Sequence, residues 1–144
     1  MRGLLGEILS AQADMTVVDM EAGLEHLSRS GGTLRYVDHL LVVVEPYAKA
    51  VETARRTVRL AHELGIARVS LLASKVRDEA EVALLDALRA ELDVELIGVV
   101  PYDDAARLAD RAGRPPIEVA PDCPMVKAVA QLADKLATAD AAIV

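Results

Sequence analysis

Aromatic residues are nearly absent from this sequence. Its 144 residues include no Trp, no Phe and three Tyr, although 53% of them are hydrophobic. The core must therefore be built from Ala, Val, Leu and Ile. A domain of this length buries roughly 70% of the surface of its unfolded chain, so no disulfide or metal is needed to explain its stability. We expect a single domain over residues 1–144.

Cysteine and positive charge are also scarce. Cys123 is the one cysteine, which excludes a disulfide framework within the chain and favours a reducing, cytoplasmic compartment. The 16 basic residues are outnumbered by 23 acidic ones, for a formal net charge of −7. Nucleic acids and anionic membranes are bound by basic surfaces, so we expect neither as a partner.

Long apolar runs are missing as well. No apolar stretch approaches the roughly 18 residues of a membrane-spanning helix. The first residues contain a short apolar run that Glu7 interrupts, which does not fit the apolar region of a signal peptide. The sequence therefore predicts a soluble protein without a membrane anchor.

Four short apolar runs are present and are rich in Val, Leu or Ile. They are continuous rather than alternating, which is typical of strands buried on both faces in a parallel sheet. We therefore predict about four strands. Their positions are Met15–Val18, Leu40–Val44, Val69–Ala73 and Leu96–Val100.

Helical patterns separate these runs. Val51–Leu64 carries one apolar stripe and is followed by Gly65, a residue that often ends helices. Glu79–Leu92 repeats the pattern, with Asp78 as its predicted N-cap. Alternating strands and helices with short connections predict an α/β fold with a doubly wound, mostly parallel sheet. The remaining predictions are helices at Ala105–Ala112 and Met125–Leu136 and a frayed tail at Ala137–Val144.

Polar clusters follow the predicted strands, where open parallel sheets bind their ligands. Asp19 ends the first apolar run, and a carboxylate there could hold Mg²⁺. Gly23 would let the backbone approach a phosphate closely. The alternative is an ordinary aspartate that caps the next turn. The four clusters begin at Asp19, Glu45, Ser74 and Pro101.

The run VVDMEAGLEHL at residues 17–27 resembles the Walker B and switch II segment of the carbon monoxide dehydrogenase maturation ATPase (CooC) family. That family belongs to the MinD/ParA class of P-loop ATPases. The resemblance extends from about Arg2 to Leu136. Further similar segments are DHLLVVVEP, RVSLLASKVRDE, LIGVVPYDD and ADRAGRPP.

The resemblance implies a site for ATP or ADP with Mg²⁺. Asp19 would be the Walker B carboxylate near the metal. Glu21 and Gly23 would lie in switch II, which senses the γ-phosphate. No catalytic residue is assigned.

The resemblance also implies a nucleobase region at Lys75 and at Pro101, Tyr102 and Asp103. The family has Asn before the lysine, whereas this chain has Ser74. A hydroxyl cannot read the base at two points as an amide does. Tyr102 would either pack on the base or serve ordinary packing.

Two family features are missing from these 144 residues. The glycine-rich phosphate loop has no counterpart, since Ser30–Thr33 lacks an adjacent Lys and follows no strand. The metal-binding Cys-x-Cys pair is also absent, and a specific metal site needs more ligands than Cys123 provides. We therefore expect no autonomous ATPase activity.

In the family, the phosphate-loop strand lies between the strands that correspond to Met15–Val18 and Leu40–Val44. Without it, the sheet should either have a gap or close by direct pairing of Thr16–Asp19 with Leu40–Val44. Closure would leave an exposed edge. The segment Arg2–Leu9 could cover part of it; otherwise we expect a homo-oligomer or a partner chain that supplies the missing strand.

Three functional hypotheses remain open. The chain is a nucleotide-binding accessory protein of the nickel-enzyme maturation type, which needs a phosphate loop from another polypeptide. Alternatively, it is a non-catalytic interaction module that acts through homo- or hetero-oligomers. The third hypothesis is a truncated form of a longer ATPase.

Overall fold

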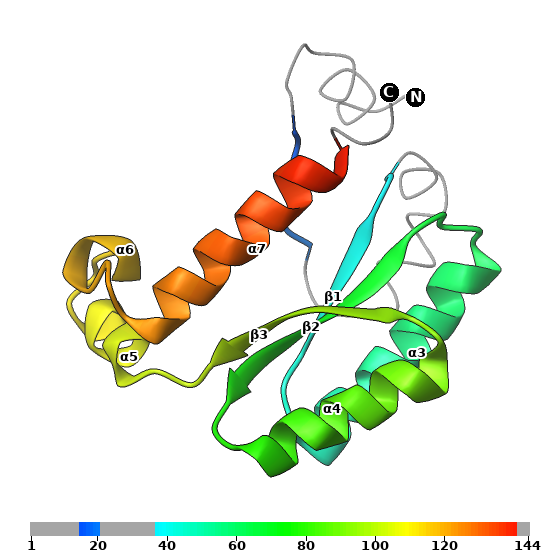
Figure 1. Cartoon of the computed structure of the whole chain (residues 1–144), viewed down its shortest axis with the longest axis horizontal. Helices are drawn as coiled ribbons and strands as arrows, with labels where there is room; N and C mark the ends of the chain where they lie inside the picture. The colour runs from blue at the N-terminus through cyan, green and yellow to red at the C-terminus, as the bar shows by residue number, and fades with distance from the viewer. Residues whose placement is uncertain (1–14, 21–36, 141–144) are drawn as a thin grey trace.

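The computed structural model describes residues 15–20 and 37–140, and these contain a parallel sheet flanked by helices (Figure 1). The sheet has the strand order β1-β2-β3, and both strand pairs are parallel. Its strands are β1 (Leu40–Val44), β2 (Val69–Val76) and β3 (Glu95–Pro101). The helices are α3 (Ala48–Glu63), α4 (Glu79–Leu92), α5 (Asp104–Arg111), α6 (Pro116–Val119) and α7 (Pro124–Asp140).

The α/β class and the parallel sheet are confirmed, but the predicted strand Met15–Val18 is wrong. Residues 15–20 form no helix or strand, and the Val17 side chain is 82% exposed. Direct pairing with β1 does not occur. A strand needs a hydrogen-bonded neighbour, and an apolar run alone does not provide one. The described part of the sheet therefore has three strands, and β1 lies at its edge.

The two central helices follow the predicted patterns. The buried residues of α3 are Val51, Ala54, Val58 and Ala61, which belong to the predicted stripe, whereas Leu64 lies beyond the helix and is half-buried. Gly65 adopts a φ of 75° after the end of the helix. Glycine takes this left-handed conformation without a steric penalty. Asp78 caps α4 as predicted, because its carboxylate accepts a hydrogen bond of 2.9 Å from the Glu81 N–H.

The C-terminal third contains two differences from the prediction. The short helix α6 was not predicted; Pro115 and Pro116 fix the backbone at its start. Helix α7 extends to Asp140, so the expected frayed tail is wrong for residues 137–140. None of the described helices combines the length and apolar character that crossing a membrane would require.

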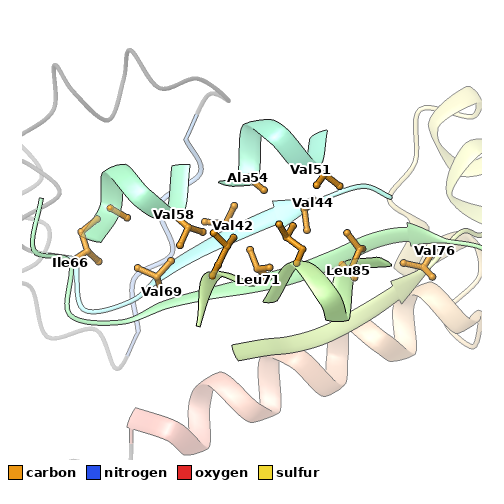
Figure 2. Close-up of a cluster of buried hydrophobic side chains, with 14 residues drawn as sticks. Val42, Val44, Val51, Ala54, Val58, Ile66, Val69, Leu71, Val76 and Leu85 are labelled. Carbon is orange, nitrogen blue, oxygen red and sulfur yellow. The ribbon is translucent and has the colours of Figure 1, made fainter. Parts of the chain in front are cut away.

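Helices cover the two faces of the sheet unequally (Figure 1). Helices α3 and α4 pack on one face and enclose a cluster of 14 buried side chains (Figure 2). Helix α7 packs on the other face, where the buried cluster comprises Leu72, Ile97, Val100 and Leu132. Strand alternation places Val43 on the α7 face, and it is 60% exposed there. The described helices therefore cover β1 well on one face only.

The two edges of the sheet also differ. The β2–β3 register shifts between Leu71 and Leu72 on β2, opposite Ile97, and the Ile97 carbonyl accepts a hydrogen bond of 3.0 Å from Lys135 on α7. Bulges and lysines of this kind protect an edge from further pairing. Strand β1 pairs with β2 in unbroken register and contains no charged residue or proline. Among the described residues, β1 therefore lacks the usual protection of an edge strand.

Candidate functional site

A hollow of about 670 Å³ lies beyond the carboxyl ends of β2 and β3, next to the starts of α5 and α7. This is where open parallel sheets bind ligands. The structure brings together five of the residues that the sequence assigned to a nucleotide site. These are Ser74, Lys75, Pro101, Tyr102 and Asp103.

The other assigned residues do not join this hollow. Asp19 is exposed and does not line it. Glu21 and Gly23 lie outside the described residues. Within residues 15–20 and 37–140 there is no group of three or more His, Cys, Asp or Glu side chains that could hold a metal. The role of Asp19 near Mg²⁺, which the resemblance implies through a bound nucleotide, therefore stays a prediction.

Lys75 is held in an unusual backbone conformation at the end of β2. Its φ is 56°, in the left-handed region, where the register between β2 and β3 shifts. Non-glycine residues pay a steric penalty there, and such residues concentrate at functional sites. The Lys75 ammonium donates to Glu45 Oε1 at 2.8 Å, and this hydrogen bond raises the pKa of Lys75. Lys75 thus ties the ends of β1 and β2 together.

Asp103 joins two helices at the rim of the hollow. Its carboxylate accepts a hydrogen bond from the Ala105 N–H at 2.9 Å, which caps α5. It also accepts from the Met125 N–H at 3.4 Å, in the first turn of α7. The bonds from Ala105, Met125 and the Cys123 thiol lower the pKa of Asp103, with Ala105 contributing most. Asp103 therefore has a structural role besides any contact with a ligand.

Arg77 covers the Tyr102 ring. Its guanidinium carbon lies 4.3 Å from the ring centroid, which is a cation–π distance. The Arg77 N–H donates to Glu81 Oε2 at 2.6 Å, which fixes its backbone at the start of α4. No role for Arg77 is predicted from the sequence, although Arg77 lies in the polar cluster that begins at Ser74. The contact with Tyr102 was not predictable from spacing.

The remaining lining residues give the hollow an apolar wall and balanced charge. Val100, Ala106 and Met125 supply apolar surface. Three acidic side chains, Glu45, Asp103 and Asp110, face three basic ones, Lys75, Arg77 and Arg107. Two of these cations are already paired, Lys75 with Glu45 at 2.8 Å and Arg107 with Asp104 at 3.1 Å. This chemistry suits a flat, mostly uncharged ligand better than a polyphosphate.

Comparison with known proteins adds to this geometry. No protein-family model matches the chain. An uncharacterized ATP-binding protein of Methanocaldococcus jannaschii is 37% identical over 115 residues, which cover 80% of this chain and 44% of that protein. The carbon monoxide dehydrogenase accessory protein CooC of Rhodospirillum rubrum is 37% identical over 123 residues, covering 85% and 45%. The chain therefore spans about half the length of the curated relatives that it matches.

Solved structures show the same fold. The septum site-determining protein MinD of Pyrococcus horikoshii, in complex with Mg-ADP, superposes with a TM-score of 0.70 at 19% identity, covering 92% of this chain and 55% of that one. The cell division protein MinD of Aquifex aeolicus gives a TM-score of 0.60 at 20% identity, covering 72% and 45%.

Proposed function

Since the chain belongs to the MinD/ParA class of the P-loop ATPase superfamily, close to the CooC family, we propose that it binds the base and sugar of an adenine nucleotide in the hollow beyond β2 and β3. The observation that carries this proposal is the convergence of Ser74, Lys75 and the Pro101–Asp103 loop on one hollow. The resemblance to the CooC family independently implies a nucleobase region at these segments.

We further propose that the chain does not hydrolyse ATP unaided. Phosphoryl transfer depends on phosphate and metal contacts, and the 144 residues contain no glycine-rich phosphate loop. Asp19, the proposed Walker B carboxylate, lies outside the hollow. Hydrolysis would need a phosphate loop from outside these 144 residues. Together with such a loop, the chain would act as a cytoplasmic accessory protein in metalloenzyme maturation of the nickel-enzyme type.

Calorimetric titration with adenosine, ADP and ATP, each with and without Mg²⁺, tests the binding proposal. We expect a dissociation constant for ATP above about 10 µM, because most phosphate contacts are missing. We expect adenosine to bind nearly as well as ATP, with little effect of Mg²⁺. No binding of any of the three at millimolar concentration would refute nucleotide binding. Affinity that is tight and depends on Mg²⁺ would refute the absence of a phosphate site.

A second candidate function is a non-catalytic interaction module, either as it stands or as part of a longer ATPase. It is favoured by the edge of β1, which no described strand pairs with, and by Val43, which is 60% exposed. Strands of this kind pair readily with another chain. We propose that a second copy of the chain or a partner polypeptide supplies a strand alongside β1. Light scattering of the purified chain at micromolar concentration should then show a dimer or larger species, and a monomer would contradict self-association.

A further inference from the structure

Arg77 is set apart from the other arginines by its partners. Every other arginine in the described part of the chain except Arg111 forms an ion pair with an Asp or Glu side chain. Within residues 15–20 and 37–140, the Arg77 guanidinium has no such pair and instead lies over Tyr102. It also lines the hollow and is exposed. Its hydrogen-bond donors and one of its faces are therefore available to a ligand.

The contact with the Tyr102 ring restrains the position of the guanidinium. A free arginine side chain has several rotatable bonds and loses conformational entropy when it binds a ligand. The ring holds the Arg77 guanidinium at 4.3 Å before any ligand arrives. Tyr102 is held in turn, because its backbone N–H donates to the Val76 carbonyl at 2.8 Å and links the end of β3 to β2. The pair is therefore preorganised by the sheet.

We propose that Arg77 is the stacking surface for the nucleobase, with Tyr102 as its support. Planar guanidinium groups stack on nucleobases as they do on aromatic side chains. The base would form the third layer of a Tyr102–Arg77–base stack, inside a hollow whose other walls are partly apolar. This inference rests on the proposed nucleotide binding and names a binding residue for it.

The local charge favours a base over a phosphate as the partner of Arg77. Lys75 and Arg107 are paired, so Arg77 is the unpaired cation among the described lining residues. Asp103 and Asp110 line the same hollow, and Glu81 Oε2 lies 2.6 Å from the Arg77 backbone nitrogen. These carboxylates would repel a polyphosphate. A neutral base avoids that repulsion and still gains from the cation–π contact.

Three variants test the proposal by calorimetry with adenosine, ATP and inorganic tripolyphosphate. Arg77→Ala should weaken the binding of adenosine and of ATP by the same factor, about tenfold, because stacking on the base is lost for both ligands. Arg77→Lys keeps the positive charge but lacks the planar guanidinium, so this variant should bind adenosine and ATP about as weakly as Arg77→Ala does. Arg111→Ala is the matched control, since Arg111 also lacks an ion pair in the described chain but does not line the hollow; it should bind like the unchanged protein.

The possible failures separate this inference from the proposed function. If the unchanged protein binds neither adenosine nor ATP, both fail. If it binds them and the Arg77 variants bind equally well, the inference alone is wrong. Two results would assign Arg77 to phosphate binding and overturn the stacking role. One is full affinity in Arg77→Lys. The other is weaker binding of ATP, but not of adenosine, in Arg77→Ala. Circular dichroism melting of each variant checks that it is folded.

An independent readout uses the scarcity of aromatic residues. The chain has three Tyr and no Trp or Phe, so it has few tyrosine ring signals in a proton NMR spectrum, and single Tyr→Leu variants can assign them. Adenosine should shift the Tyr102 ring signals and move those of Tyr47, which does not line the hollow, much less. If Tyr102 does not respond while adenosine binds, the base lies elsewhere and the inference fails.

Discussion

The two faces of the sheet differ in how completely they are packed. On the α3/α4 face, 14 buried side chains form one cluster, and Leu71 and Leu85 are fully buried. On the α7 face, the buried cluster has four members, and Val43 is exposed. The hollow with the candidate site opens beyond the carboxyl ends of β2 and β3, next to the start of α7. The α3/α4 face, here called the dense face, therefore stabilises the fold. The α7 face, here called the thin face, leaves surface for ligands and partners.

The largest effect should come from the dense face. Leu85→Ala would remove a side chain that is 0% exposed, and we expect it to lower the free energy of unfolding by about 2–5 kcal/mol. Leu132→Ala on the thin face should lower the free energy of unfolding by about 2 kcal/mol or less, because Leu132 is 8% exposed and has few buried neighbours. Urea denaturation measures both. Equal costs would contradict the difference between the faces.

A smaller effect on the free energy of unfolding is expected at Asp103, whose carboxylate connects α5 and α7. Its folded-state pKa lies below the ordinary value of 3.8, so the folded state binds fewer protons than the unfolded state. The stability that it contributes is present above about pH 4 and is lost as the pH falls through the lowered folded pKa. Asp103→Asn should therefore be less stable than the unchanged protein at neutral pH and lose less stability on acidification.

The control for this experiment is Asp104→Asn, which changes a neighbouring carboxylate that is paired with Arg107 on the surface. Exposed pairs of this kind contribute little. Urea midpoints measured from neutral pH down to about pH 3 should show the shallower dependence for Asp103→Asn and not for Asp104→Asn. A steeper acid loss in Asp103→Asn would show that the sign is wrong.

The smallest effect on stability is expected at the exposed position of β1. Val43→Lys should change the free energy of unfolding of the isolated chain by less than about 0.5 kcal/mol, because Val43 is 60% exposed. A charge on an edge strand opposes pairing with another chain, so the variant should shift the light-scattering mass towards the monomer. Strong destabilisation together with an unchanged mass would indicate that Val43 is covered within the chain.

Much of the fold was predictable because it depends on neighbours in the sequence. The limits of β1, the cap at Asp78 and the left-handed Gly65 follow from local apolar patterns and backbone preferences. The same local reasoning failed for Met15–Val18. An apolar run shows that residues can be buried, but not which strand is present to pair with them.

The candidate site was predictable only in part. That Ser74, Lys75 and the Pro101–Asp103 loop would meet follows from the topology of a parallel sheet, in which the strand ends share one edge. Three features could not be predicted: the positive φ of Lys75, the hydrogen bond from Met125 to Asp103, and the cation–π contact of Arg77 with Tyr102. Separation along the chain does not reveal the contact between Arg77 and Tyr102, because they are 25 positions apart and so are Ser74 and Val99.

The sequence by itself thus determined the elements and their order, because propensity and periodicity are local. Tertiary packing decided which side chains meet, because those contacts depend on the register and the position of whole elements.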